Sequence, residues 1–287
     1  MHTQSSNNTQ EITLVLGGTG KTGSRVAQRL QARGVSTRIG SRSATPAFDW
    51  GLPDTWEAAL ENVSAVYISY APDLAIPGVT DTIRRFVDRA VARGVKRLVL
   101  LSGRGEQEAQ ACEQIVQSSD LEWTIVRASW FMQNFSEGEF QGMIQAGVIT
   151  LPAADIPEPF IDVDDIADVA VAALTEAGHT HEVYEVTGPR LLTFTEAARE
   201  ISAAAGREVR FMQIPKQDFN QAIADSGAPD DLIWLMNYLF ETVLDGRNAH
   251  LADGVQRALG REPRDFTLFA QQIASEGRWT AADENVA

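Results

Sequence analysis

The hydrophobic positions in the first half of the chain form short continuous runs separated by amphipathic segments. The apolar runs lie at residues 12–16, 36–40, 65–69, 97–101 and 123–127, with a shorter one at 47–49. Such runs are typical of strands buried on both faces. Between them, segments such as GVTDTIRRFVDRAVARG (78–94) and EQEAQACEQIVQSS (106–119) repeat apolar residues at helical spacing. The alternation predicts an α/β fold, a doubly wound parallel sheet with helices on both faces.

The pattern beyond residue 128 is looser and mixes strands with helices. It predicts a strand in GVITL (147–151), a helix starting near Val163 after a proline-rich loop, and strands in HEVYEVTG (181–188) and REVRFMQI (207–214). Thr193 and Glu196 have the spacing of a capping box, which predicts a helix start. Most of the chain after residue 214 is predicted to be helical.

The stretch ITLVLGGTGKTG (12–23) places glycines directly after the first predicted strand. A triphosphate-binding loop ending in this Gly-Lys-Thr would need a glycine at position 15, which is valine. The spacing fits the dinucleotide-binding turn of a Rossmann-type fold, and the alternative is a tight turn with no ligand. The residues expected to hold a diphosphate at the N-terminus of the next helix are Gly17, Thr19, Gly20, Lys21, Thr22 and Gly23.

The end of the second predicted strand indicates which dinucleotide is bound. NAD sites usually place a carboxylate there for the ribose 2′-hydroxyl, but this chain has Gly40, followed by Ser41 and Arg42. We expect Ser41 and Arg42 to bind a 2′-phosphate, which favours NADP(H); the alternative for Arg42 is a solvated side chain. Asp49 is expected either to accept from the adenine amino group or to cap a helix. Other strand ends add Ser69, Ser102 and Ala128 to the expected cofactor site.

These patterns predict two main parts and two tails. Residues 11–150 are expected to form the NADP-binding Rossmann domain, to which segments near 160–187 return. Residues 151–275 are expected to form mainly a smaller mixed α/β lobe that shapes the substrate site. Residues 1–10 are predicted to be a disordered tail, and residues 276–287 a flexible one.

Composition and charge exclude several classes of protein. The net charge of −15 is unevenly distributed along the chain. Up to Arg127 there are 14 Lys and Arg and 13 Asp and Glu residues, and beyond it there are 10 Lys and Arg and 26 Asp and Glu residues. This balance argues against nucleic acid as a partner. No apolar run has the length of a membrane span, and the single cysteine, Cys112, suits the reducing cytoplasm and is expected to be a buried small side chain. The four histidines have no metal-ligand spacing, so no metal is expected. A homodimer is one assembly the sequence allows.

Five segments together resemble a known family. They are LVLGGTGKTG, FDW, WTIVRASWFMQNFSE, PFIDVDDIADVA and GREPRDF. The chain resembles the NmrA-like branch of atypical short-chain dehydrogenases/reductases from about residue 11 to 274, and within it the ergot-alkaloid clavine (festuclavine/agroclavine) dehydrogenase-like group. The resemblance implies a Rossmann domain, NADP(H) binding and a C-terminal lobe that shapes a small-molecule pocket.

The chain departs from standard short-chain dehydrogenases at the proton-donating pair. Those enzymes use a serine at a strand end and Tyr-x-x-x-Lys on the next helix. Ser102 is kept, but the tyrosine and lysine positions fall near Gly105 and Ala109. Hydride transfer to an iminium or quinonoid cation needs no such acid, and the resemblance implies iminium reduction. The catalytic group is left unassigned, with Ser102, Tyr70 and Trp130 as candidates.

The segment RASWFMQNF (127–135) is expected to wall the substrate pocket. Its candidates, with Tyr70 from an earlier strand end, are Trp130, Phe131, Met132, Asn134 and Phe135. Aromatic faces stabilise cations, although some of these rings are alternatively plain core. Asp162, Asp164 and Asp165 are expected to cap a helix, the alternative being attraction of a cationic substrate. The function expected is that of an NADPH-dependent oxidoreductase; the alternative is a non-catalytic NADP(H) sensor that acts through a protein partner.

Overall fold

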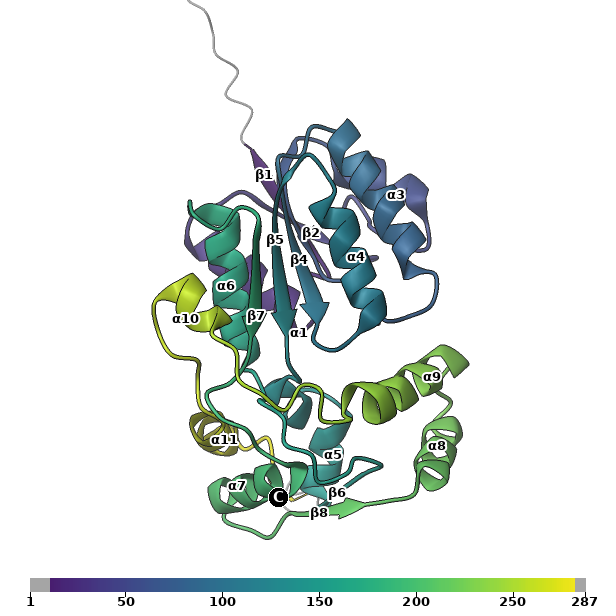
Figure 1. The fold of residues 1–287 in the computed structure, drawn as a ribbon, viewed down its shortest axis with the longest axis vertical. Helices are drawn as coiled ribbons and strands as arrows, with labels where there is room; N and C mark the ends of the chain where they lie inside the picture. The colour runs from purple at the N-terminus through teal and green to yellow at the C-terminus, as the bar shows by residue number, and fades with distance from the viewer. Residues whose placement is uncertain (1–10, 282–287) are drawn as a thin grey trace, which may run out of the picture.

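The computed structural model describes residues 11–281 and consists of a sheet-containing lobe above a smaller mixed lobe (Figure 1). Six parallel strands form the main sheet in the order β2-β1-β3-β4-β5-β7. They are β1 (Ile12–Leu16), β2 (Thr37–Gly40), β3 (Val63–Ile68), β4 (Arg97–Gly103), β5 (Glu122–Ala128) and β7 (Glu182–Val186). The predicted fold class, a Rossmann-type doubly wound sheet, is confirmed.

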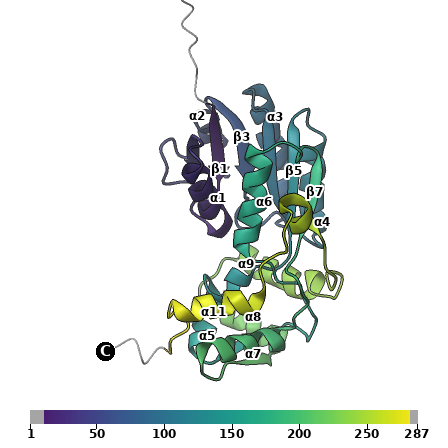
Figure 2. The same cartoon turned by 90° about the vertical axis from the view of Figure 1, so that its left-hand side faces the viewer.

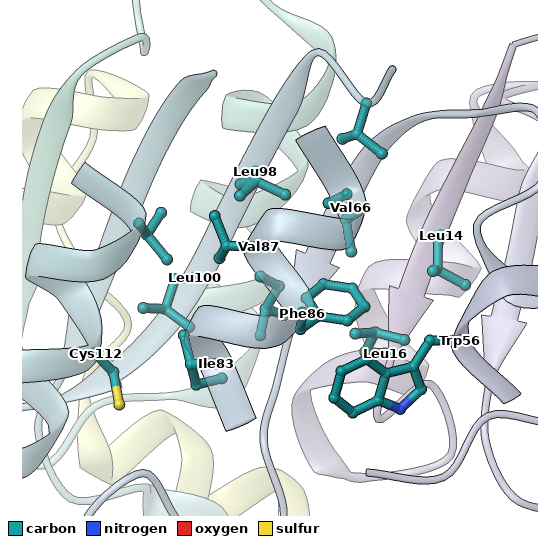
Figure 3. Close-up of a cluster of buried hydrophobic side chains, with 14 of the residues drawn as sticks. Leu14, Leu16, Trp56, Val66, Ile83, Phe86, Val87, Leu98, Leu100 and Cys112 are labelled. Atoms are coloured by element: carbon teal, nitrogen blue, oxygen red, sulfur yellow. The ribbon is translucent and has the colours of Figure 1, made fainter. Parts of the chain in front are cut away.

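Helices cover both faces of this sheet because successive residues of a strand point to opposite sides. Leu14 and Leu16 pack toward α3 (Val79–Ala92) and α4 (Gln107–Gln117), whereas Val15 packs toward the other face. That other face is covered by α1 (Lys21–Ala32), α6 (Val163–Thr175) and α10 (Gly254–Leu259). Figure 3 shows the first layer, in which Phe86 of α3 lies beside Leu16 and Trp56. Cys112 is buried in this layer, as predicted.

The predicted strand at 47–49 is not formed. Phe48 is buried in the layer under α3, beside the short η1 (Pro53–Thr55) and α2 (Trp56–Ala59). The main chain of Asp49 bonds to side chains: its N–H donates to Thr55 Oγ1 at 3.0 Å, and its carbonyl accepts from Trp56 Nε1 at 2.8 Å. Because these side chains satisfy the backbone groups, the segment remains an irregular loop outside the sheet.

The second lobe is built around a short parallel pair, β6 (Val148–Leu151) and β8 (Arg210–Gln213). Its helices, which share one aromatic-rich core, are η2 (Met132–Phe135), α5 (Glu139–Gln145), α7 (Phe194–Ala205), α8 (Lys216–Asp225), α9 (Asp230–Tyr238) with a π-turn at Leu239–Val243, and α11 (Phe266–Ser275). The capping box of Thr193 and Glu196 at the start of α7 is present as predicted. No helix in the described part of the chain is long and apolar enough to cross a membrane.

The chain passes between the lobes several times (Figure 2). β7 pairs with β5 in the main sheet, and α10 packs against α6 and β7 although it follows most of the second lobe in sequence. Beyond α11, Trp279 is buried and its Nε1 donates to the Phe135 carbonyl at 2.8 Å. The packed chain therefore extends past the predicted boundary at residue 275. The predicted tail at 1–10 and the last part of the other, 282–287, lie outside the described residues.

Candidate active site

The glycine-rich turn between β1 and α1 is compact because three glycines allow close backbone contacts. Gly17 has φ +67°, a conformation that favours glycine, and its N–H donates to the Gly40 carbonyl at 3.1 Å. The Gly20 N–H in turn donates to the Gly17 carbonyl at 2.9 Å. A Cβ on Gly23 would lie 2.2 Å from the Gly17 oxygen. The first turn of α1 is thereby held directly against the end of β1.

The N-terminus of α1 is suited to an anion. Its N-cap, Gly20, has no side chain to accept from the first-turn N–H groups, and the first turn contains no acidic residue. Unpaired N–H groups and the helix dipole favour negative charge at such an end. Thr22 and Gly23 are buried in this turn, whereas Thr19 and Gly20 are exposed. The residues present therefore fit a diphosphate.

The end of β2 has the charge that a phosphorylated ribose requires. Arg42 is exposed, and the hydroxyl of Ser41 lies 3.3 Å from that of Ser43. The Arg38 guanidinium donates to the carbonyls of Ala59 and Glu61, which holds the connection into β3. The Asp49 carboxylate accepts the Gly51 N–H at 2.8 Å, so it stabilises a local turn. Of the two arginines near the end of β2, Arg38 binds backbone carbonyls and Arg42 is exposed.

A cavity of about 620 Å³ lies over the carboxyl ends of β3, β4 and β5. Ligands in doubly wound sheets bind at this edge. The predicted site residues that line the cavity are Lys21, Ser69, Tyr70, Ser102, Ala128, Trp130, Phe131 and Asn134. From the second lobe, Leu235 and Met236 of α9 also line it, which the sequence did not indicate. Figure 1 shows α9 beneath the ends of the strands.

Two predicted pocket residues are placed elsewhere. Met132 and Phe135 do not line the cavity; both are buried in the core of the second lobe. Phe135 packs against Phe160 and Phe266 with ring centroids about 5.5 Å apart. The prediction of these two as pocket residues was wrong, because the 3-10 turn η2 points them away from the cavity. They are core residues of the second lobe, which was the alternative expectation.

The three candidates for catalysis have different surroundings. The Ser102 hydroxyl donates to Glu113 Oε1 at 2.6 Å, and Glu113 also binds Arg127, so this serine is engaged by a buried carboxylate. Tyr70 lies against Trp50, and burial raises the pKa of its hydroxyl. Trp130 packs against Phe240 of the second lobe. Tyr70 is the one tyrosine among the described residues lining the cavity.

Two carboxyl groups of the cavity were missed from the sequence. Asp73 follows β3 and Glu106 follows β4, and both line the cavity. Their side chains share a hydrogen bond, and Glu106 is only 6% exposed. The available signal was that both lie in segments directly after predicted strands, where ligand-binding groups gather. Among residues 11–281, no group of three or more His, Cys, Asp and Glu side chains could hold a metal ion.

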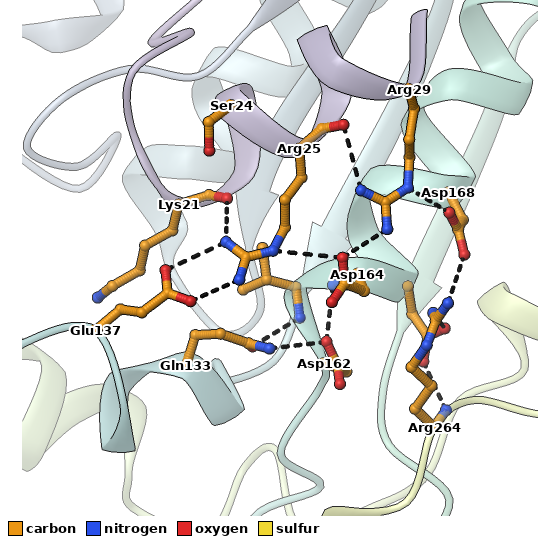
Figure 4. Close-up of polar contacts among 12 residues, drawn as sticks. Lys21, Ser24, Arg25, Arg29, Gln133, Glu137, Asp162, Asp164, Asp168 and Arg264 are labelled. Carbon is orange, nitrogen blue, oxygen red and sulfur yellow. Dashed lines mark hydrogen bonds and ion pairs between the residues drawn. The ribbon is translucent and has the colours of Figure 1, made fainter. Parts of the chain in front are cut away.

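A polar network joins α1 to the second lobe beside the cavity (Figure 4). Lys21 Nζ donates to Asn134 Oδ1 at 2.9 Å, and Arg25 binds Glu137. At the start of α6, the Asp162 carboxylate accepts the Asp164 N–H at 2.8 Å, so its predicted capping role is confirmed. Asp164 pairs with arginines of α1, and Asp165 with Arg261 and Arg264. None of these three aspartates lines the cavity.

Comparison with known proteins agrees with this geometry. A family model described as NAD(P)H-binding matches residues 17–177, the region that contains the glycine turn and most of the sheet. The chain belongs to this NAD(P)H-binding family. The protein is an NAD(P)H-dependent oxidoreductase.

The relatives span almost the whole chain. The uncharacterized oxidoreductase YesF of Bacillus subtilis is 35% identical over 95% of this chain and 98% of its own. The NAD(P)H azoreductase of Xenophilus azovorans is 33% identical over 91% and 98%, and the festuclavine dehydrogenase of Aspergillus fumigatus 32% over 93% and 98%. The predicted resemblance to the NmrA-like and clavine dehydrogenase-like group is therefore confirmed. Triphenylmethane reductase of Citrobacter sp., crystallised with NADP(H), has the same fold, with a TM-score of 0.74, 19% identity and coverage of 92% and 99%.

Proposed function

We propose that this oxidoreductase prefers NADPH and reduces small, electrophilic organic acceptors without a tyrosine–lysine pair. The observation that carries the proposal is the cavity itself, because it is bounded by the α1 N-terminus, the strand ends and an aromatic wall. The proposal is supported by the residue types at the aligned positions, because neither Gly105 nor Ala109 has a side chain that can donate a proton. A sensor whose pocket is filled is less consistent with a cavity of about 620 Å³.

The chain's own residues would bind the cofactor and orient the acceptor. Bound NADPH supplies a hydride. The glycine turn and the α1 N-terminus would hold its diphosphate, and Arg42, with Ser41, its 2′-phosphate. Tyr70, Trp130 and Phe131 would pack against a flat, electron-poor acceptor, and the edge of α9 would exclude water from it.

The clavine-type and azo relatives suggest the acceptor classes to test. An iminium ion and a triarylmethane cation accept hydride directly, whereas quinones, aldehydes and azo compounds also need a proton. We expect NADPH oxidation, followed by nicotinamide absorbance, with at least one of these acceptors. NADPH binding without oxidation by any of them would contradict the proposal and favour the sensor.

Cofactor preference is tested by binding as well as by rate. Arg42→Ala is expected to weaken NADPH binding about tenfold and to leave NADH binding within about twofold, because only NADPH carries the 2′-phosphate. Arg33→Ala is the matched control, since Arg33 pairs with Glu176 at the far end of α1. Equal affinities of the R42A variant and the unaltered protein for NADPH, by calorimetry, would refute this role of Arg42.

A further inference from the structure

Contacts with nearby backbone position the Asp73 and Glu106 carboxyl groups in the cavity. Asp73 lies in the turn after β3, where its Oδ1 accepts the Ala75 N–H at 2.8 Å. Glu106 is the N-cap residue of α4, yet its side chain makes no capping hydrogen bond. It folds back over β4 instead: a Cβ on Gly103 would lie 2.1 Å from Glu106 Oε1. A side chain at position 103 would therefore displace the Glu106 carboxyl group from its position in the cavity.

The pair needs one proton. Two carboxyl groups bond to each other only when one of them is protonated. Burial, followed by the charge of Asp73, raises the pKa of Glu106 well above its usual value, and burial also raises the pKa of Asp73. Asp73 accepts from Ala75 as well, which favours its charged form. Glu106 therefore holds the proton and Asp73 the negative charge.

The neighbouring charges reinforce this arrangement. Glu108 and Glu113 on α4 act on Glu106 as carboxylates that raise its pKa further, and Cys112 and Tyr238 face the pair as neutral groups with raised pKa values. The cations that line the cavity are engaged elsewhere. Lys21 donates to Asn134, and Arg104 binds Glu185 and Ser129.

We propose that Glu106, oriented by Asp73, is the proton donor for acceptors that gain negative charge on reduction. The inference rests on the proposed function and extends it to neutral acceptors such as quinones, carbonyl compounds and azo compounds. Among the described residues lining the cavity, Glu106 is a buried acid that holds a proton where a tyrosine is missing.

The step balances in protons and electrons. Hydride adds to the electrophilic atom, and the π-electron pair moves to its oxygen or nitrogen partner. The O–H bond of Glu106 breaks as the new O–H or N–H bond of the product forms. Both carboxyl groups are then charged, and the pair regains one proton from water. Because two buried carboxylates repel each other, this proton is readily taken up.

Comparing acceptors that need a proton with acceptors that do not distinguishes proton donation by Glu106 from a purely structural role. We expect Glu106→Gln to lower kcat for a neutral quinone about 100-fold or more, the range for loss of a general acid. Reduction of a triarylmethane cation by the same variant should fall by less than about threefold, because no proton is transferred. Asp73→Asn should give a smaller loss, again confined to the quinone. Glu61→Gln is the control: Glu61 is exposed and does not line the cavity.

Equal losses on both acceptors in the E106Q variant would overturn the proposal. Failure of the unaltered protein to reduce any acceptor would instead refute the proposed function, and a spectroscopic readout then still tests the pair. Infrared spectroscopy at pH 7 to 8 should show a protonated-carboxyl band that is lost in the E106Q variant and kept in the E61Q variant. An E158Q background removes the contribution of Glu158, whose pKa is also raised by burial. Absence of that band from the unaltered protein would also overturn the proposal.

Discussion

The Arg25 guanidinium binds the Glu137 carboxylate across the two lobes, with Nη2 and Oε1 2.5 Å apart and Nη1 and Oε2 3.2 Å apart. Arg25 belongs to α1, and Glu137 follows η2 in the segment that also carries Asn134. The pair is bidentate and its side chains are about one-fifth exposed. Paired charges of this geometry are directional, so the contact fixes the second lobe relative to the α1 N-terminus.

Breaking this ion pair is expected to weaken binding of the acceptor more than it lowers the stability of the fold. Arg25→Ala should lower the free energy of unfolding by about 1 kcal/mol, because the pair is only partly buried. The KM for the acceptor should rise several-fold as the lobe loses its position. Urea denaturation and steady-state kinetics measure the two effects. A double-mutant cycle with Glu137→Ala should give a coupling near 1 kcal/mol, and additive effects would contradict a direct contact.

The glycine turn is expected to tolerate no side chain at position 23. Gly23→Ala would place a Cβ 2.2 Å from the Gly17 carbonyl oxygen, a backbone atom that is held by the Gly20 N–H and has little room to shift. We expect a loss of about 2 kcal/mol or more in unfolding free energy and a loss of NADPH binding. Gly142→Ala is the control, since its Cβ would meet nothing within 4 Å in α5; it should stabilise by about 0.5–1 kcal/mol.

Glu158 is expected to make stability depend on pH. It is fully buried, and neither carboxylate oxygen has a hydrogen-bond partner. Burial raises its pKa from 4.5 to about 7. Between these values the folded protein holds a proton that the unfolded chain releases. The free energy of unfolding therefore falls as pH rises from about 4.5 to 7, by roughly 3 kcal/mol from this group. Glu106, whose pKa is raised too, adds to the same slope.

Glu158→Gln should remove part of that slope. Its unfolding free energy at pH 8 should exceed that of the unaltered protein, because the amide carries no charge to bury. Urea denaturation at several pH values between 5 and 8 measures this. Glu61→Gln, at an exposed position, should leave the slope as it was. An unchanged slope in the E158Q variant would show that another group is responsible.

Trp279 is expected to be essential to the second lobe. Trp279→Ala should cost about 3–5 kcal/mol, since the buried ring packs against Phe269 and its Nε1 bonds to the Phe135 carbonyl. Trp279→Phe should cost less because an aromatic ring remains. Trp234→Ala is the matched control: this tryptophan is 39% exposed, so less than about 1 kcal/mol is expected. Thermal denaturation of the three variants shows whether the segment that carries Trp279 stabilises the second lobe or is dispensable.

The sequence predicted the features that depend on neighbouring residues. The buried strands, the helices α3 and α4 and the capping box of α7 were evident because apolar spacing and cap residues act within a few positions. The glycine turn was evident for the same reason: Gly17, Gly20 and Gly23 must contact one another within one turn. Expectation and structure diverged at residues 47–49, where the side chains of Thr55 and Trp56 bond to the Asp49 backbone groups that a strand would have paired.

The sequence by itself thus determined the buried strands of the sheet and the cofactor turn, both of which follow from local spacing. Only the tertiary structure decided which side chains reach the cavity. Met132 and Trp130 are two residues apart, yet one is buried in the second lobe and the other lines the cavity. Asp73 and Glu106 meet because β3 and β4 are adjacent in the sheet and Glu106 folds back over Gly103. Contacts between residues 33 positions apart depend on how strands pair, which apolar spacing alone leaves open.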